Sequence, residues 1–434
     1  MNSMSNNDIS FDGASNKSFI HANHKTVITS DTPNIAMINK LKKEFVSELK
    51  NINDWWINNT VDETSGGFFG EVSAQGKVNK YATKGIVLNT RILWYFSEVA
   101  LVIQNENSRA MADRAYHYLM EFFDDKDKGG VVWALDHTGK VIDTKKQTYA
   151  QSFAIYALSS YYQLTGNKSA IDKALEYFEL LEKYTLDTEQ GGYLEAFSQD
   201  WQEIEDMRLS EKDANFPKTM NTHLHVLEAY SNLQKIYPTE AVSKALKRLV
   251  NYFQGAIVDH ASYHLRLFMC RHWGDHSKAY SYGHDIECSW LLHKSLKALE
   301  DEKLTAKILP TVVNLAQTCL AEGIGKHGQV LDEIDLKTGK VHEESCWWIQ
   351  AEALVGFLNA YTLTADKNYF DTMVNIWQFI KKYHIDHENG EWHWLATLDQ
   401  KSDYDIYKAG FWKGPYHNGR ALMEGLKLLD AIKL

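Results

Sequence analysis

The sequence predicts an all-α protein, an (α/α)6 barrel of six inner and six outer helices with short β-hairpin loops. A glycine–aromatic signature recurs along the chain at intervals of about 62 to 70 residues, which indicates stacked supersecondary units. An apolar helix with a polar opening follows each signature, and a second, amphipathic helix follows most of these. Only five prolines occur in 434 residues, as expected where helices dominate.

A polar segment precedes the repeats. Residues 1–35 are rich in Ser and Asn and show neither a helical nor a strand period, so we expect a disordered N-terminal extension. Helical patterning starts close behind it, with Ile38, Leu41, Phe45 and Leu49 on one stripe. Because one closed core serves the remaining length, residues 36–434 are predicted to form a single catalytic barrel domain.

The repeated signature has the composition of a turn followed by a hairpin. Acidic residues stand ahead of several copies, as turns favour, and short alternating stretches after the glycines predict small β-hairpins. The copies lie at 66–69, 129–133, 191–195, 255–265, 325–331 and 390–394, and the preceding acids are Asp62, Asp124, Asp187 and Asp386.

Each predicted inner helix opens with polar side chains and continues as an apolar run, whereas segments such as 173–184 and 369–382 are amphipathic and fit an outer layer. An open helical solenoid, with a long groove in place of a central pocket, is the competing interpretation. In register, the openings are Asn89-Thr90-Arg91, Gln151-Ser152, His223-Leu224-His225, Asp285-Ile286-Glu287, Gln350-Ala351-Glu352 and Asn418-Gly419-Arg420.

Composition disfavours several kinds of partner. The formal net charge of −11 argues against nucleic acid and anionic membranes. No window approaches about 18 consecutive apolar residues, and the N-terminus does not read as a secretory signal. The four cysteines form no CxxC pair and are typical of reduced thiols, so we expect a cytoplasmic protein, monomeric by default. Thirteen Trp and 23 Tyr serve mainly core packing, and some offer stacking surface for a sugar.

The polar openings are expected to converge on one end of the barrel. Three of them carry histidines at equivalent places, more than isolated core histidines would explain. His284 and Glu287 are three residues apart and share a helical face, so the carboxylate is expected to hold and polarise the imidazole. The converging residues are Arg91, Asn221, His225, Glu228, His284, Glu287, Glu352, His417 and Arg420.

Two other kinds of site fit parts of this set. His225 with Glu228, and His284 with Glu287, have the spacing of metal-ligand pairs, although no zinc motif such as HExxH is present. A glycoside hydrolase would place two carboxylates across a sugar cleft. The abundance of histidine favours proton transfer at carbon over both. The candidates for the carboxylate pair are Asp285, Glu287 and Glu352.

Five long motifs resemble the N-acylglucosamine 2-epimerase family, and the resemblance covers roughly residues 38 to 434. It implies an (α/α)6 barrel that epimerises the C2 carbon of a reducing-end glucose without metal or other cofactor. The motifs are NTHLHVLEAY at 221–230, GHDIE at 283–287, WWIQAEA at 347–353, GFLNAY at 356–361 and FWKGPYHNGR at 411–420.

The same resemblance implies roles for single residues. His284 and His417 resemble the family's two acid/base histidines. His225 and Arg91 resemble the groups that stabilise the intermediate, and Glu287 belongs with these catalytic residues. The residues expected to bind substrate are Tyr149, Asn221, Glu228, Trp347, Trp348, Glu352 and Trp412.

The expected substrates are β-1,4-linked disaccharides such as cellobiose and lactose, because Trp347, Trp348 and Trp412 would supply aromatic surface for a second sugar ring. A monosaccharide isomerase of the same superfamily, interconverting mannose and fructose, is the nearest alternative. A metal-dependent or carboxylate-pair sugar hydrolase and a non-catalytic sugar-binding protein are the alternatives from other classes.

Overall fold

The computed structural model describes residues 33–398 and 406–432. Most of the expected N-terminal extension therefore lies outside the described residues. The first helix, α1, begins at Ile35, one residue before the expected barrel boundary. Asn34 caps it, because its side chain accepts a 2.8 Å hydrogen bond from Met37 N. The described chain from Pro33 onwards forms one compact unit.

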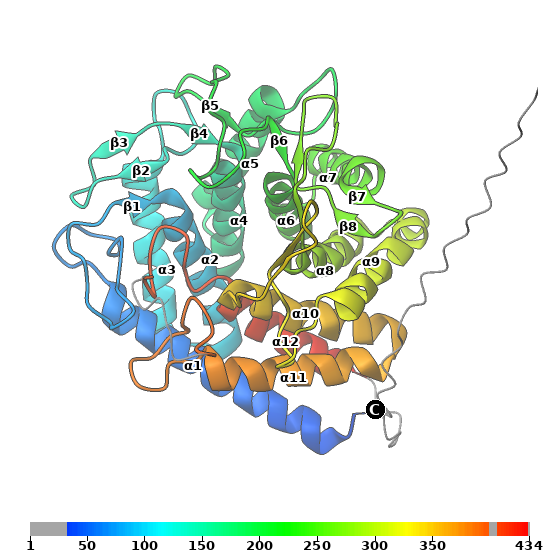
Figure 1. Cartoon of the computed structure of the whole chain (residues 1–434). Coiled ribbons are helices and arrows are strands. Elements are labelled where there is room, and N and C mark those ends of the chain that lie inside the picture. Colours follow the sequence, from blue (N-terminus) through cyan, green and yellow to red (C-terminus); the bar gives the residue numbers. More distant parts are fainter. Residues whose placement is uncertain (1–32, 399–405, 433–434) are drawn as a thin grey trace, which may run out of the picture. The chain divides into compact units, whose positions relative to one another are not determined.

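Six inner helices stand in a closed ring, and each contacts the next, with α12 returning to α2 (Figure 1). Six outer helices pack against them, so the predicted (α/α)6 barrel is confirmed and the open solenoid is wrong. The inner helices are α2 (Ile86–Ile103), α4 (Thr148–Thr165), α6 (Met220–Ile236), α8 (Tyr282–Leu299), α10 (Trp347–Thr364) and α12 (His417–Ala431). The outer helices are α1 (Ile35–Thr60), α3 (Glu106–Tyr118), α5 (Lys168–Leu180), α7 (Glu240–Tyr252), α9 (Glu302–Glu322) and α11 (Lys367–Tyr383).

The two layers differ in the way that the sequence predicts. Inner helices are buried nearly all round, whereas an outer helix such as α7 buries one stripe and exposes the rest. By length and composition alone, α2 is apolar enough to cross a membrane, but 78% of it is buried inside the barrel. Its apolarity therefore matches its place between α4 and α12 in the core.

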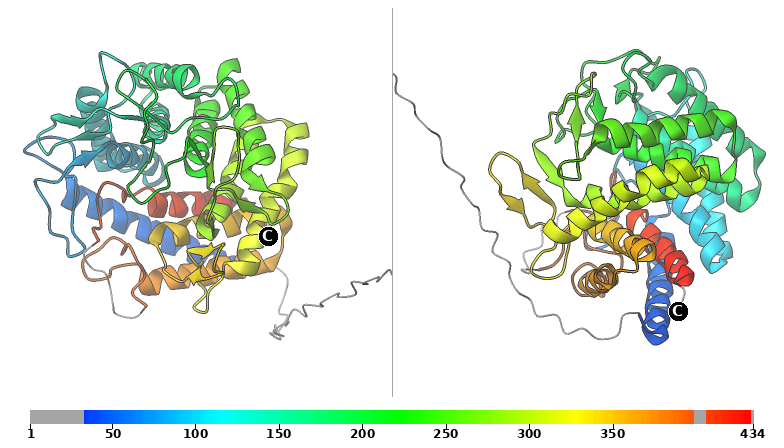
Figure 2. Two further views of the ribbon diagram at one scale, coloured as in Figure 1. Left: turned by 45° about the horizontal axis from the view of Figure 1, so that its top comes forward. Right: turned by 90° about the vertical axis from the view of Figure 1, so that its right-hand side faces the viewer.

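Short antiparallel strands tie each repeat to the next at one end of the barrel (Figure 2). The strand that precedes an inner helix pairs with a strand that follows the next glycine signature, so consecutive helix openings are held in register. The pairs are β1 (Lys84–Gly85) with β2 (Ala134–Leu135), β4 (Lys146–Gln147) with β5 (Ala196–Phe197), β6 (Lys218–Thr219) with β9 (Phe268–Met269), and β10 (Ala279–Ser281) with β11 (Glu333–Asp335). The remaining strands are β3 (Val141–Asp143), β12 (Val341–His342) and the hairpin β7 (Val258–Asp259) with β8 (His264–Leu265).

Buried ion pairs reinforce the same corners. The turn acid of a signature binds a buried lysine just ahead of an inner helix, and its other oxygen accepts backbone N–H groups of the turn. In the second copy this acid is Asp125, not Asp124, since the turn amides reach Asp125. Asp124 instead accepts a 2.7 Å hydrogen bond from Tyr177. The pairs are Asp62–Lys84, Asp125–Lys146, Asp187–Lys218 and Asp386–Lys408.

Candidate active site

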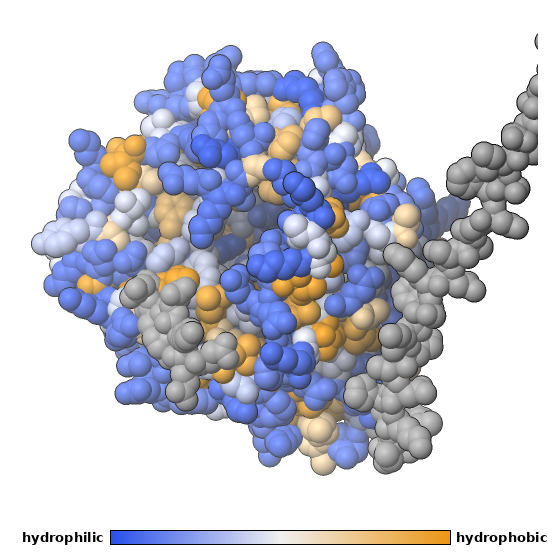
Figure 3. Space-filling view, viewed as in Figure 1, coloured by the Kyte–Doolittle hydropathy of each residue, from blue (hydrophilic) through white to orange (hydrophobic). Residues whose placement is uncertain are grey.

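The polar openings divide into two sets of side chains that point in different directions. The first set fastens the inner helix to the glycine signature: Gln151, His223, Asp285 and Gln350 each accept a hydrogen bond from a backbone N–H of that segment, at 2.8 to 3.0 Å. We call these four residues the fastening residues. The second set, two residues further on, includes His225, Glu287, Glu352 and Arg420, which gather at the centre of the barrel. Figure 3 shows this face hollowed near its centre.

His284 stands at the start of α8 beside a small cavity. Its Nδ1 lies 2.8 Å from Ser281 Oγ, and its Nε2 has no hydrogen-bond partner among the described residues. Burial lowers the pKa of His284 to about 3, so the ring is neutral at neutral pH. Asn221 lines the same cavity, of about 90 Å³. The expected hydrogen bond from the His284 imidazole to the Glu287 carboxylate is absent. The Ser281 hydroxyl binds His284 instead, because Glu287 turns toward Arg420.

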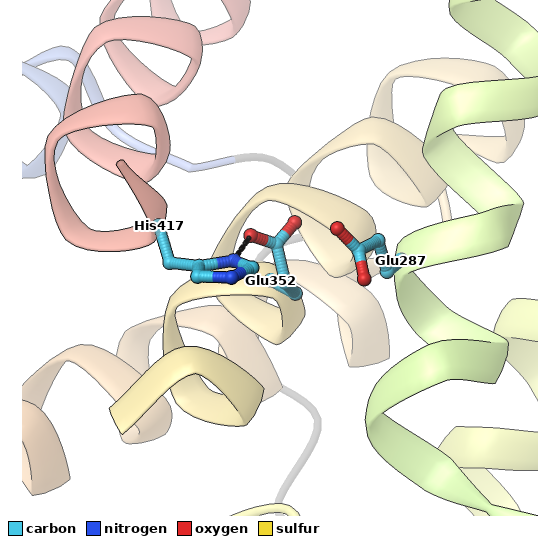
Figure 4. Close-up of side chains that lie close together, drawn as sticks. All are labelled: Glu287, Glu352 and His417. Carbon is cyan, nitrogen blue, oxygen red and sulfur yellow. Dashed lines mark hydrogen bonds and ion pairs between the residues drawn. The ribbon is translucent and has the colours of Figure 1, made fainter. Parts of the chain in front are cut away.

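His417 opens α12 and is held by a carboxylate. Its Nδ1 lies 2.7 Å from Glu352 Oε1 (Figure 4), and Trp290 Nε1 donates to the other oxygen of Glu352 at 3.1 Å. The Nδ1 proton is therefore committed to Glu352, which leaves Nε2 as the basic nitrogen. Burial and the nearby guanidinium groups of Arg91 and Arg420 hold the pKa of His417 well below its ordinary value.

The rings of the two histidines share one aromatic neighbour. The ring centroid of Trp348 lies 4.7 Å from that of His284 and 5.8 Å from that of His417. The structure thus brings both predicted acid/base histidines to one tryptophan, and the unpartnered nitrogen of each is free for a ligand.

Arg420 forms ion pairs with a group of three buried carboxylates near the histidines. Its Nη2 lies 2.6 Å from Glu287 and 2.6 Å from Glu352, and its Nη1 binds Glu228 and the Tyr416 hydroxyl. All five side chains are fully or almost fully buried. The four ionisable residues Arg420, Glu228, Glu287 and Glu352 are called the acid cluster below.

One guanidinium cannot neutralise three carboxylates, so the acid cluster holds a proton. Burial alone would raise the pKa of Glu228, but Arg420 keeps it below its usual value, so Glu228 is ionised. Glu352 uses both oxygens to accept hydrogen bonds. Glu287 Oε2 has no partner among the described residues, and burial together with the charge of Glu352 raises the pKa of Glu287 to about 8. We assign the proton to Glu287.

His225 and Arg91 complete the pocket on the other side. His225 Nδ1 lies 3.2 Å from Glu228, and burial lowers its pKa. Arg91 donates to the Tyr149 hydroxyl at 2.8 Å and binds the carbonyl of Trp412, so α2, α4 and the Trp412 loop meet at one guanidinium. Glu228 has both oxygens occupied by Arg420, Tyr416 and His225 and does not reach the cavity as a ligand-binding group.

The acid cluster with His417 also has the composition of a metal site. Glu287, Glu352 and His417 place ligand atoms within 4.8 Å of one another. The Arg420 guanidinium, however, already lies between the two carboxylates at 2.6 Å from each, where a cation would bind. Glu228, which was expected to bind a metal ion together with His225, is also paired with the Arg420 guanidinium. The donor set therefore fits a buried arginine better than a metal ion.

The predicted tryptophans have different surroundings. Trp412 borders a cavity of about 410 Å³ together with Trp133, Phe411 and Lys145, a volume in the range of small-molecule sites. Trp347 is 3% exposed and packs on Trp394 at 4.4 Å between centroids. Trp347 is thus a packing residue beneath the site, contrary to the expectation that it would bind a sugar.

Several residues at the site were not predicted as functional. Tyr416 lies between Glu228 and Arg420, and Trp290 holds Glu352. Arg420 was expected among the converging residues, but the sequence assigned it no role. Asp285, a candidate for a hydrolytic carboxylate pair, binds His264 and Leu265 N instead, so it does not enter the pocket.

The fold and this pocket agree with one family of enzymes. The N-acylglucosamine 2-epimerase family matches residues 67–419, and the chain belongs to it. The chain is 41% identical to the cellobiose 2-epimerase of Bacteroides fragilis over 88% of this chain and 98% of that protein. The solved cellobiose 2-epimerase of Bacillus thermoamylovorans superposes with a TM-score of 0.85 at 36% identity, over 90% of this chain and 99% of that one. The D-mannose isomerase of Marinomonas mediterranea is 24% identical over 85% of this chain and 93% of that protein.

Proposed function

We propose that this chain is a cellobiose 2-epimerase that converts the reducing-end glucose of a β-1,4-linked disaccharide to mannose, and back. The observation that carries the proposal is the pair of neutral histidines, His284 and His417, at one tryptophan with an unpartnered nitrogen on each. The relatives named cellobiose 2-epimerase, which match nearly their whole length, support the same substrate class.

Inversion at C2 requires removal of a proton from one face of the carbon and return of a proton to the other face. After the sugar ring opens, one imidazole takes the C2 proton and the carbon becomes planar in a cis-enediolate. The other histidine takes up a solvent proton at Nε2 and delivers it to the opposite face of C2, which returns this ring to its neutral form. The first imidazolium releases the C2 proton to solvent. Nδ1 of His417 donates to Glu352 and Nδ1 of His284 is hydrogen-bonded to Ser281, so the proton transfers use Nε2.

The enediolate carries negative charge on oxygen, which the pocket must stabilise. Arg91 is buried between Tyr149 and the Trp412 carbonyl, and its Nε has no hydrogen-bond partner among the described residues. His225 lies 4.8 Å from Tyr149 between ring centroids. We assign Arg91 and His225 to this oxygen. None of these steps uses a metal ion or nucleotide.

A disaccharide needs room for a second ring beyond the reacting one. The cavity beside Trp412, with Trp133 and Phe411 on its wall, offers an apolar face and polar neighbours such as Lys145. A monosaccharide isomerase would have less use for that surface. The cavity therefore favours disaccharide epimerisation over interconversion of mannose and fructose.

Product analysis tests the proposal directly. Purified protein treated with EDTA is incubated with cellobiose, and in a parallel tube with mannose, and the products are separated by chromatography. We expect glucosyl-mannose in the first tube. Fructose in the second tube with unchanged cellobiose would make the chain a mannose isomerase, and free glucose would make it a hydrolase.

Substitution of Trp412 separates the two sugar positions. Trp412→Ala removes an aromatic platform and should raise the KM for cellobiose by about fivefold, because a stacked ring contributes on the order of 1 kcal/mol beyond its buried area. Exchange of the C2 proton of free mannose, which fills only the inner position, should change much less. Trp394→Phe, which alters a ring packed on Trp347, is the control. Equal losses on both sugars would contradict the second subsite.

The proton on Glu287 predicts an alkaline limit to activity. With a pKa of about 8, Glu287 ionises above that pH and adds negative charge beneath an anionic intermediate, so kcat/KM should fall. The free energy of unfolding also falls as pH rises. The Glu287 carboxyl keeps its proton in the folded protein, whereas in the unfolded chain it loses the proton above about pH 4.5. This group therefore lowers stability as pH rises from 4.5 to 8.

Two substitutions check this assignment. Glu287→Gln should flatten the alkaline limb, whereas Glu195→Gln should leave it in place, although burial also raises the pKa of Glu195 to about 8. Glu195 is a matched control because it binds Thr219 and Thr222 outside the acid cluster. An unchanged alkaline limb in Glu287→Gln would remove Glu287 as its source.

A further inference from the structure

The sixth glycine signature differs from the first three at a position where the backbone is left-handed. Gly67, Gly130 and Gly192 have φ of +62°, +73° and +83°, and each carbonyl accepts a hydrogen bond from the turn acid's N–H. Glu391 makes the same backbone hydrogen bond to Asp386 with φ of +59°. A side chain with a Cβ is strained there, so its presence needs a compensating contact.

The Glu391 side chain is buried, with 3% of the residue exposed, and has four partners. Its Oε2 accepts a 2.8 Å hydrogen bond from Trp56 Nε1. Its Oε1 accepts from Trp392 N at 3.0 Å, from Lys413 Nζ at 3.1 Å and from Asn418 Nδ2 at 2.6 Å. Two of these partners flank the segment 414–417, which ends in His417.

The sixth repeat uses Glu391 where four of the other repeats use a direct contact. Three of the fastening residues, His223, Asp285 and Gln350, bind a signature N–H and stand two residues before a residue of the central set. By this spacing Asn418, two residues before Arg420, holds the equivalent place. Its amide does not reach Trp392 N; the Glu391 carboxylate lies between them and binds both.

These contacts determine the position of His417, because His417 immediately precedes Asn418. The N-cap residue of α12, Tyr416, makes no side-chain capping hydrogen bond. Lys413 is fully buried, binds Glu391 and the Lys408 carbonyl, and follows Trp412. Glu391 thus fixes both ends of the short loop that presents Trp412 and His417.

We propose that Glu391 is a positioning residue for His417, and that its left-handed backbone is retained for this purpose. The inference rests on the proposed function, in which His417 transfers a proton at C2. It acts through the Asn418 amide and the Lys413 ammonium and requires no contact between Glu391 and the sugar.

Glu391→Gly tests the proposal because glycine is the residue of the first three signatures and removes the backbone strain. The fold should survive, while kcat for epimerisation should fall about 100-fold, the loss expected for a displacement of about 1 Å. Glu391→Gln keeps an acceptor for Trp392 N and Asn418, so it should retain more activity.

A second readout separates positioning from general destabilisation. His417 released from its place should titrate nearer its ordinary pKa, so the pH profile of kcat in Glu391→Gly should gain an acid limb near pH 6, absent from the unmutated protein. Glu48→Ala is the control: this buried carboxylate of the same corner binds Trp392 Nε1 and Asn51, and none of the residues 408–418. It should lower Tm without changing the profile.

A kcat within twofold of the unmutated protein and no acid limb in Glu391→Gly would overturn the proposal. The position of His417 in crystals of Glu391→Gly provides a test that does not depend on activity. A displaced ring supports the inference even if the unmutated protein acts on another sugar, and a ring that superposes on the original refutes it. Failure of the unmutated protein to convert cellobiose would instead count against the proposed function alone.

Discussion

His284→Ala and His417→Ala are each expected to lower kcat for epimerisation by a factor of about 10³, within the range that one general acid or base contributes. Each variant removes the base or the acid for one face of C2, and no other side chain in the described pocket has an unpartnered imidazole nitrogen at Trp348. Initial rates on cellobiose at saturating concentration, corrected for folded protein, measure the effect.

The control uses a histidine on the same helix as His284. His293 lies on α8 farther from its opening, is 8% exposed and binds Asn359 at 2.6 Å. His293→Gln keeps a polar partner for Asn359 and should change kcat by less than about threefold. If His284→Ala kept more than a tenth of the original rate, the assignment of His284 to proton transfer would be wrong.

Arg420→Met is expected to be the most destabilising single substitution in the pocket. It removes the buried cation shared by Glu228, Glu287 and Glu352 and should cost about 3–5 kcal/mol of unfolding free energy, as measured for broken buried ion pairs. Activity should fall as well, because Glu352 would lose the partner that orients it toward His417. Thermal unfolding and cellobiose turnover measure the two effects.

A compensating variant tests the physical cause. Adding Glu228→Gln to Arg420→Met removes one of the charges left unpaired and should recover part of the lost Tm. Arg248→Met breaks an ion pair with Glu182 whose side chains are 31% and 22% exposed, so its effect should be clearly smaller. Equal losses of Tm in Arg248→Met and Arg420→Met would show that burial is not the reason for the contribution of the acid cluster to stability.

The fold could be predicted because the sequence features that define it recur at regular intervals. The recurrence of the glycine signature and the contrast between apolar and amphipathic helices define the repeat, and each repeat buries its core by packing on the next. The exact turn acid, Asp125 in place of Asp124, was not predictable, because adjacent aspartates have the same turn propensity and only the backbone register selects one.

The residues of the site could be predicted from the sequence, but the hydrogen bonds and ion pairs between them could not. Spacing placed His225, His284 and His417 at equivalent openings, and the resemblance assigned the proton-transfer pair. Spacing could not show that Glu287 would bind Arg420 and not His284, because both lie within reach of its side chain and tertiary packing decides between them. Tertiary packing also separates the adjacent residues Trp347 and Trp348. Trp347 packs on Trp394, whereas Trp348 lies beside His284.

The measurement that tests the central claim most directly is the fate of the C2 proton in D2O. Cellobiose is incubated with the protein in D2O and followed by NMR at C2 of the reducing-end sugar. The two-histidine account predicts deuterium at C2 of the glucosyl-mannose product, with both exchange and product formation lost in His284→Ala and His417→Ala. Glucosyl-mannose formed with its original C2 proton would contradict proton transfer through solvent-exchangeable imidazoles and refute the account.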